Sequence, residues 1–212
     1  MSEPRTTADV QAGHRGALDG LAAAFGVGLD GGALARLESF VALFLNWNRS
    51  INLASLRADD ELVGRHLVDS FALAALVGTD VASAVDVGSG GGLPAIPLAV
   101  LLPSTTFELF EPNRKRAAFL RTAIRELALG SRVQVETQSV EAPVPEPLRG
   151  RFELALSRAT LAPPAWLSLG LHLVRPGGRV AVFAAGQSDA GLPHADAARS
   201  YGEGRRLLLF RG

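Results

Sequence analysis

The residues with the clearest chemical potential form a glycine-rich turn. The string AVDVGSGGGLPAIP, residues 84–97, passes from a short apolar run into residues 88–92, of which four are glycine. Glycine lets the backbone approach a ligand closely, because it carries no Cβ. A carboxylate, Asp86, precedes the first glycine by two residues. Such a turn directly after a strand is typical of a site that binds a nucleotide or nucleoside cofactor.

The spacing of the glycines separates two classes of cofactor. The dinucleotide fingerprint G-x-G-x-x-G would need its last glycine at position 93, where this chain has Leu93. Gly88, Gly90 and Gly92 instead give the pattern D-x-G-x-G-x-G. A second acid, Glu111, ends the next predicted strand, where a carboxylate can accept both hydroxyls of a ribose. This combination resembles the fold that binds S-adenosylmethionine.

The elements that must hold this turn alternate between strand and helix. Apolar runs predict strands at 83–88, 105–111, 132–137, 152–159, 179–185 and 205–210, and helical periodicity predicts helices at 93–102, 114–129 and 164–174. Two further helices are predicted before them, at 32–49 and 59–78. The pattern predicts an α/β fold with a doubly wound, mostly parallel sheet, preceded by a small helical part. Ligands of such sheets bind beyond the carboxyl ends of the strands, where the glycine turn lies.

Composition limits the classes of protein that are possible. The chain has 212 residues, 48% of them hydrophobic, which suffices for one sizeable core. It has no run that could span a bilayer and no signal-like start, so we expect a cytoplasmic protein without a membrane partner. The absence of cysteine excludes disulfides, thiolate metal sites and a cysteine nucleophile. The formal net charge is zero, so a polyanionic partner must meet a local basic patch.

Elimination narrows the methyl acceptors that such a site can serve. Cytosine C5 methylation needs a cysteine nucleophile, and the D/N-P-P-Y/F/W motif of amino-group methyltransferases is absent. A lysine-rich tetrad for ribose 2′-hydroxyl methylation is impossible, because Lys115 is the only lysine. The acceptor that remains is one that is already nucleophilic, such as guanine N7, which has no proton to lose. Catalysis would then rest on alignment and electrostatics, and we expect no certain catalytic residue.

Separate motifs in a fixed order carry a family resemblance. The strings are LNWNRSINLASLR (45–57), GRHLVDS (64–70), DVGSGGGLPAIPLA (86–99), KRAAFLR (115–121) and SRA (157–159). Together they resemble the RsmG/GidB family, the bacterial 16S ribosomal RNA guanine-N7 methyltransferases, from about residue 41 to residue 187. The resemblance implies a class I S-adenosylmethionine-dependent methyltransferase domain at 83–212. It would follow a helical part at 17–82 and residues 1–16, which we expect to be disordered.

The resemblance also implies roles for individual residues. Gly88, Gly90 and Leu93 would lie against S-adenosylmethionine, and Glu111 would bind its ribose, although the family more often has aspartate there. Further along, the implied cofactor residues are Val140 and Glu141, beside the adenine ring, and Arg158, at the end of the fourth strand. Arg158 could meet the methionine carboxylate or the RNA, which makes it the one possible catalytic residue.

Basic residues supply the candidate RNA contacts. They are Arg65, His66, Arg114, Lys115, Arg116 and Arg121. The last four lie on the helix predicted at 114–129, where phosphate binding and an ordinary solvated face are both possible. His66 could bind a base or simply pack. Metal binding is not expected, since no second histidine is spaced to join His66.

Three alternatives to an rRNA methyltransferase stay open at this point. A small-molecule methyltransferase of the same fold would suit the neutral net charge. A nicotinamide-dependent oxidoreductase would share the glycine turn, but Leu93 argues against it. A non-catalytic RNA-binding relative would not need an intact cofactor turn. The leading hypothesis has 16S rRNA, within the 30S subunit or its assembly intermediate, as the partner of a monomeric enzyme.

Overall fold

A seven-stranded sheet with the order β3-β2-β1-β4-β5-β7-β6 forms the centre of the protein. The structure is a computed structural model that describes residues 7–56, 61–186, 191–202 and 204–212, with only the backbone for residues 7–12. Its strands are β1 Ser83–Val87, β2 Thr106–Phe110, β3 Val133–Glu136, β4 Phe152–Ser157, β5 Val174–Ala185, β6 Ala197–Tyr201 and β7 Arg205–Arg211. The strands β1 to β5 pair in parallel, and β7 and β6 add an antiparallel edge. The predicted fold class is therefore confirmed.

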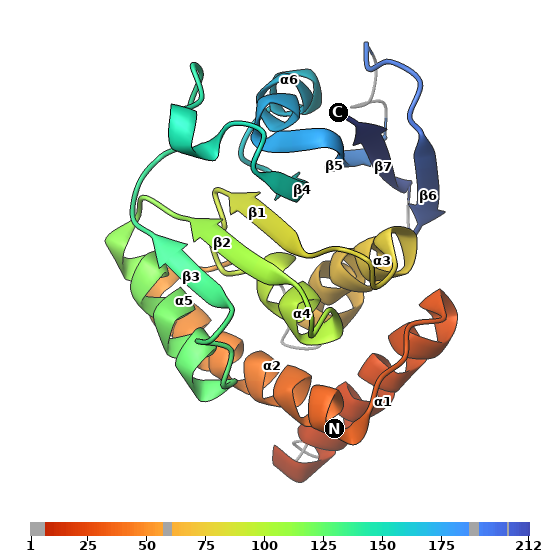
Figure 1. Ribbon diagram of the computed structural model, residues 1–212. Coiled ribbons are helices and arrows are strands. Elements are labelled where there is room, and N and C mark those ends of the chain that lie inside the picture. Colours follow the sequence, from red (N-terminus) through yellow and green to blue (C-terminus); the bar gives the residue numbers. More distant parts are fainter. Residues whose placement is uncertain (1–6, 57–60, 187–190, 203) are drawn as a thin grey trace.

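The two faces of the sheet are covered unequally (Figure 1). On one face lie α1 Thr7–Phe25, α2 Gly31–Ile51, α3 Val68–Val77, α4 Ala95–Leu101 and α5 Arg114–Glu126. On the other face, α6 Pro163–Leu173 packs on β4 and β5. The loop between β3 and β4, which contains the short 3-10 helix η2 Glu146–Leu148, covers part of that second face. Because one helix and a loop cannot cover the whole sheet, this face leaves room for a ligand.

The helices before β1 share their core with the sheet. Phe40 and Phe44 of α2 pack around Phe119 of α5, with ring centroids 5.8 to 6.4 Å apart. Trp47 also contacts Phe119, at 5.7 Å, so this tryptophan packs in the interior. Asn48 accepts hydrogen bonds from the backbone of Leu53 and Ala54 and so shapes the turn that ends α2. One continuous apolar core therefore joins the residues on either side of position 83.

Several elements differ from the sequence-based expectation. Helix α1 begins at Thr7, so the expectation of disorder is wrong for residues 7–16, while residues 1–6 lie outside the described part. The predicted helix at 59–78 is divided into a π-helical segment η1, Leu62–Leu67, and α3, and its first two residues are not described. Strand β6 was not predicted, because its residues alternate in burial without being mostly apolar. None of the described helices is both long enough and apolar enough to cross a membrane.

Candidate functional site

A cavity of ≈ 800 Å³ opens at the carboxyl ends of the parallel strands, on the face covered by α6. Its lining comes from the ends of β1 and β2, the loop after β3, the loop after β4, α6, and Arg116 of α5. This is the end of a doubly wound sheet where ligands bind. Because the strands lie in the spatial order β3-β2-β1-β4, the lining segments follow one another along the carboxyl ends of the strands. Their order is the loop after β3, the end of β2, the end of β1 and the loop after β4.

The glycine turn is held by the neighbouring strand and by α2. The backbone N–H groups of Gly88 and Ser89 both donate to the carbonyl of Phe110, at 2.8 and 3.0 Å. Gly91 lies so close to α2 that an added Cβ would stand 2.7 Å from the ring of Phe44. The turn therefore requires glycine for packing as well as for ligand approach, and the N-terminal helices help to fix its position.

Glu111 fits its predicted role at the end of β2. Its carboxylate accepts hydrogen bonds from the backbone N–H of Gly90, at 2.7 Å, and from that of Asn113, at 2.8 Å. The residue is 3% exposed and lines the cavity. Each carboxylate oxygen can accept two hydrogen bonds, so each has one lone pair left after the backbone contact. Two hydroxyls of one ligand can use these positions without displacing any protein group.

The other predicted cofactor residues divide into two groups. Gly88, Val140 and Glu141 line the cavity together with Glu111. Gly90, Leu93 and Arg158 do not line it. Gly90 holds Glu111 through its N–H, and Leu93 is 6% exposed within the larger core. These two residues support the site from behind.

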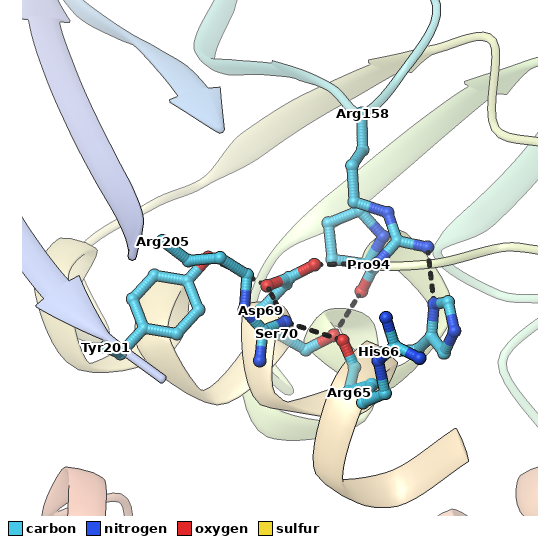
Figure 2. Close-up of polar contacts among 8 residues, drawn as sticks. All are labelled: Arg65, His66, Asp69, Ser70, Pro94, Arg158, Tyr201 and Arg205. Carbon is cyan, nitrogen blue, oxygen red and sulfur yellow. Dashed lines mark hydrogen bonds and ion pairs between the residues drawn. The ribbon is translucent and has the colours of Figure 1, made fainter. Parts of the chain in front are cut away.

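Arg158 belongs to a polar cluster beside the cavity, centred on Asp69 (Figure 2). Arg158 Nη1 lies 2.6 Å from Asp69 Oδ2, and the hydroxyl of Tyr201 donates to Asp69 Oδ1 at 2.7 Å. Arg205 Nη1 lies 3.4 Å from the same Oδ1 and donates to the carbonyl of Arg65 at 2.6 Å. Asp69 is 4% exposed. A single buried carboxylate of α3 thus ties together the residue that follows β4 and the edge hairpin of β6 and β7, and Arg205 links this cluster to η1.

His66 is held in a defined tautomer by this cluster. Arg158 Nη2 lies 3.3 Å from His66 Nδ1. A guanidinium can only donate, so Nδ1 must accept, and the proton of the neutral ring is on Nε2. Burial, and secondly the charge of Arg158, lower the pKa of His66 to about 4. The imidazole is therefore neutral near pH 7 and keeps this tautomer.

Asp86 is a buried acid beneath the glycine turn. It is 1% exposed, and its Oδ2 has no hydrogen-bond partner among the described residues. Burial is the main cause that raises its pKa to about 7. The hydrogen bond with Ser89 and the charge of Arg158 act in the opposite direction, and Glu111 adds to the increase. The protonated form of Asp86 is thus favoured in the folded protein well above the ordinary pKa of an aspartate.

The raised pKa of Asp86 predicts a pH-dependent stability. Between about pH 4 and pH 7 the unfolded chain has lost this proton while the folded protein keeps it, so the free energy of unfolding falls as pH rises. The slope for one proton is about 1.4 kcal/mol per pH unit at most. Asp86→Asn removes this contribution, and the effect is read as the difference between variant and wild type in urea unfolding from pH 4 to pH 8.

The lowered pKa of His66 has the opposite effect, because it reduces the free energy of unfolding as pH falls. This contribution is the same in the wild type and in Asp86→Asn, so it cancels when their free energies of unfolding are subtracted. The variant should gain stability relative to the wild type as pH rises to about 7 and stay level above it. A difference that does not change with pH would contradict the assignment to Asp86.

The basic candidates on α5 have unequal surroundings. Arg114 and Lys115 are exposed, and Arg116 is partly buried and lines the cavity. Arg121 donates to Thr137 Oγ1 at 2.7 Å and to a backbone carbonyl at 3.3 Å, so it has a structural role as well. Arg65 is exposed and pairs with Glu61 at 3.1 Å. No group of three or more His, Asp or Glu residues in the described part of the chain is placed to bind a metal ion.

Sequence reasoning missed two sets of residues. The first set consists of further residues that line the cavity: Phe110, Gln138, Arg149, Thr160, Ser168 and His172. The second completes the Asp69 cluster: Tyr201 and Arg205. Thr160 follows the SRA string directly and could have been found by extending it by one residue. Tyr201 and Arg205 carried no signal, because they meet Asp69 only through the tertiary fold.

Comparison with known sequences identifies similar proteins over most of the chain. The profile of the family described as "GidB: rRNA small subunit methyltransferase G" matches residues 33–204. A protein of Stenotrophomonas maltophilia named ribosomal RNA small subunit methyltransferase G is 39% identical over 152 residues, 72% of this chain and 69% of that protein. One of the same name from Hydrogenovibrio crunogenus is 37% identical over 161 residues, 76% of this chain and 72% of that protein.

Solved structures agree on the fold. A candidate O-methyltransferase of Klebsiella pneumoniae aligns with a TM-score of 0.55 at 16% identity, over 81% of this chain and 89% of that one. An O-methyltransferase family protein from Burkholderia thailandensis aligns with a TM-score of 0.51 at 15% identity, over 84% of this chain and 60% of that one. At these identities the likeness establishes the fold alone.

Proposed function

Because the chain belongs to the rRNA small subunit methyltransferase G family, we propose that it transfers the methyl group of S-adenosylmethionine to N7 of a guanine in 16S ribosomal RNA. The observation that carries the proposal is that the family's cofactor turn and Glu111 border one cavity at the carboxyl ends of the strands. The open acceptor positions of Glu111 suit a ribose, and Gly88 of the turn lines the same cavity.

The residues of the cavity fit S-adenosylmethionine in a definite order. Glu111, at the end of β2, would hold the ribose. Val140 and Glu141 follow β3 on one side and would hold the adenine. Gly88 follows β1 on the other side and would face the methionine part, with Thr160 of the loop after β4 beside it. When bound, the cofactor supplies an electrophilic methyl group on a sulfonium.

The residues of this chain act by alignment and not by proton transfer. Guanine N7 carries a lone pair and no hydrogen, so no general base is required. The protein has to hold the base in line with the methyl group and keep water away, which can lower the barrier substantially. The Arg158–His66 pair does not line the cavity, but Arg158 directly precedes Ala159 and Thr160, which do, and Arg158 is fixed by Asp69. This pair would border the base outside the cofactor cavity.

The RNA would bind across α5 and the mouth of the cavity. Arg114 and Lys115 are exposed there, and Arg116 reaches the cavity itself. Their positive charges suit phosphates, which would give a binding constant that falls steeply with salt. We propose that the partner is the 30S subunit or its assembly intermediate, that the enzyme works in the cytoplasm, and that it acts as a monomer.

Replacing Glu111 tests the cofactor assignment. Glu111→Ala is expected to weaken S-adenosylmethionine binding by about 1–3 kcal/mol, the usual cost of losing hydrogen bonds to a charged acceptor. Isothermal titration calorimetry measures the change. Glu111→Gln is the matched control, because glutamine keeps the shape of the side chain and one acceptor oxygen. Its dissociation constant for S-adenosylmethionine should lie between those of the wild type and Glu111→Ala. An unchanged dissociation constant in the alanine variant would remove Glu111 from the site.

The proposed activity is tested on 30S subunits from a strain that lacks the gene. Incubation with the protein and S-adenosylmethionine should produce 7-methylguanosine in 16S rRNA, detected by mass spectrometry of the digested RNA. Subunits from the parent strain, already methylated, serve as the control and should accept little. If no 7-methylguanosine forms while the protein binds S-adenosylmethionine, a small-molecule acceptor, which the neutral net charge also allows, becomes the better proposal.

A further inference from the structure

His66 has a free donor in the polar cluster that Arg158 connects to the loop lining the cavity. Its Nδ1 is occupied by Arg158, and no described residue forms a hydrogen bond with its Nε2. The fully buried side-chain atoms without a partner, among the described residues, are His14 Nε2 and Asp86 Oδ2. His66 Nε2 is not one of them, so it is accessible. The accessible edge of this imidazole therefore carries an N–H that can donate to a ligand.

The tautomer is imposed from outside the histidine. Arg158 can only donate, so its contact forces Nδ1 to accept and leaves the proton on Nε2. Asp69 fixes Arg158 at 2.6 Å and is itself fixed by the hydroxyl of Tyr201 at 2.7 Å. In Figure 2 these residues form a continuous path from the edge hairpin to the ring of His66. Burial, which keeps this ring neutral, acts in the same direction.

Arg158 and His66 do not line the cavity themselves, but Arg158 joins the loop that lines it at the end of β4. Arg158 directly precedes Ala159 and Thr160, both of which line the cavity next to Gly88. The ribose position, at Glu111, is two strands away along the sheet edge, in the order β2, β1, β4. A base that receives a methyl group must lie at the β1 and β4 end. His66 comes from η1, a π-helical segment, and such segments often occur at functional sites.

The edge of guanine that carries N7 also carries O6. Guanine presents two acceptors on this edge, N7 and O6, whereas adenine presents the N7 acceptor and an amino donor. Since N7 must be left free to attack, recognition on this edge has to use O6. A protein group that can only donate a hydrogen bond would bind O6 of guanine and would be repelled by the amino group of adenine. His66 in the imposed tautomer is such a group.

We propose that the Nε2–H of His66 donates a hydrogen bond to the 6-oxo group of the guanine that is methylated, and that His66 is thereby the residue that selects guanine. This inference rests on the proposed function. Arg158 and Asp69 are positioning residues in this scheme, because they set the direction in which His66 donates.

The test uses two substrates whose target bases differ at position 6 and in the N1 proton that accompanies the 6-oxo group. The methylated guanine is first located in 16S rRNA, and 30S subunits are then reconstituted from ligated rRNA that carries guanine or 2-aminopurine there. 2-Aminopurine keeps N7 but lacks O6. Transfer of a radiolabelled methyl group by the wild type should be about 10- to 100-fold faster on guanine, the usual effect of one lost hydrogen bond at a buried partner.

Two variants distinguish the effect of the Nε2 hydrogen-bond donor from the other effects of the imidazole ring. His66→Asn keeps an acceptor near Nδ1 for Arg158 but has no group at Nε2, so its rate on guanine should fall to about the rate on 2-aminopurine. His66→Gln has an N–H near the Nε2 position and should keep most of the discrimination. Affinity for S-adenosylmethionine and the melting temperature should change little in both, which a general loss of structure would not allow.

The outcomes are distinct. Equal wild-type rates on the two substrates would overturn the proposal without any variant. Wild-type discrimination that persists in His66→Asn would also overturn it. If the wild type methylates neither substrate, the proposed function itself fails, which the guanine substrate alone reveals.

Discussion

Replacing Asp69 with asparagine is expected to lower the free energy of unfolding by about 3 kcal/mol, because it removes the one buried carboxylate that two guanidinium groups share. Arg158 and Arg205 would face each other across a neutral amide, and Tyr201 would lose a charged acceptor. Both arginine side chains are only 20–25% exposed, so water compensates little. Urea unfolding without ligand measures this change. Methyl transfer, measured well below the melting temperature, should fall as Arg158 loses its position.

Two further variants identify the cause of the stability lost in Asp69→Asn. Tyr201→Phe removes only the hydroxyl and should cost about 1 kcal/mol. In the double variant Asp69→Asn/Arg158→Met one unpaired charge is gone, so its cost should be less than the sum of the two single costs. If Asp69→Asn costs no more than Tyr201→Phe, the cluster is not held together by the carboxylate.

Replacing Gly88 with alanine should damage both stability and cofactor binding. Gly88 has a φ of +74°, and an added Cβ would stand 2.3 Å from Thr160 Oγ1 and 3.1 Å from its Cβ. The left-handed backbone costs a non-glycine residue about 1–2 kcal/mol, and the overlap adds about 1–3 kcal/mol. Thr160 cannot move alone, so the loop that lines the cavity must shift. We expect S-adenosylmethionine affinity to fall by at least about tenfold in calorimetry.

The glycine turn offers matched controls for this effect. Gly90 has a φ of +55°, but an added Cβ there would meet nothing closer than 3.9 Å. Gly90→Ala should therefore show only the backbone cost. Adding Thr160→Ala to Gly88→Ala should recover part of the steric loss and some of the affinity. If Gly88→Ala and Gly90→Ala behave alike, the contact with Thr160 does not matter.

The unequal cover of the sheet explains where the cavity lies. The face packed against α1 to α5 is filled by the larger core. On the other face, α6 and the loop before β4 leave the ends of β1 and β2 open. The N-terminal helices therefore contribute to the site without lining the cavity, through Phe44 against Gly91 and through His66 and Asp69 beside Arg158.

Local patterns in the sequence suffice to predict the parallel strands and the cofactor turn. Each depends on neighbours in the chain: an apolar run, a glycine spacing, and an acid at the end of the next strand. Glu111 and the glycine turn therefore lie at the ends of neighbouring strands, and their contact at 2.7 Å follows from β1 and β2 being adjacent. The edge strand β6 was missed, because an edge strand is paired on one side and needs few apolar residues.

Which polar residues contact one another depends on the folding of distant segments onto each other. Asp69 and Tyr201 are 132 positions apart, and Asp69 and Arg158 are 89 apart. No local pattern encodes such contacts, because a buried carboxylate takes whichever donors the fold brings to it. Which ring nitrogen of His66 carries the hydrogen depends on the same long-range contacts. The glycine turn can therefore be predicted from residues that are neighbours in the chain. The arrangement of His66, Asp69 and Arg158 depends on how η1, α3, the end of β4 and the edge hairpin pack together.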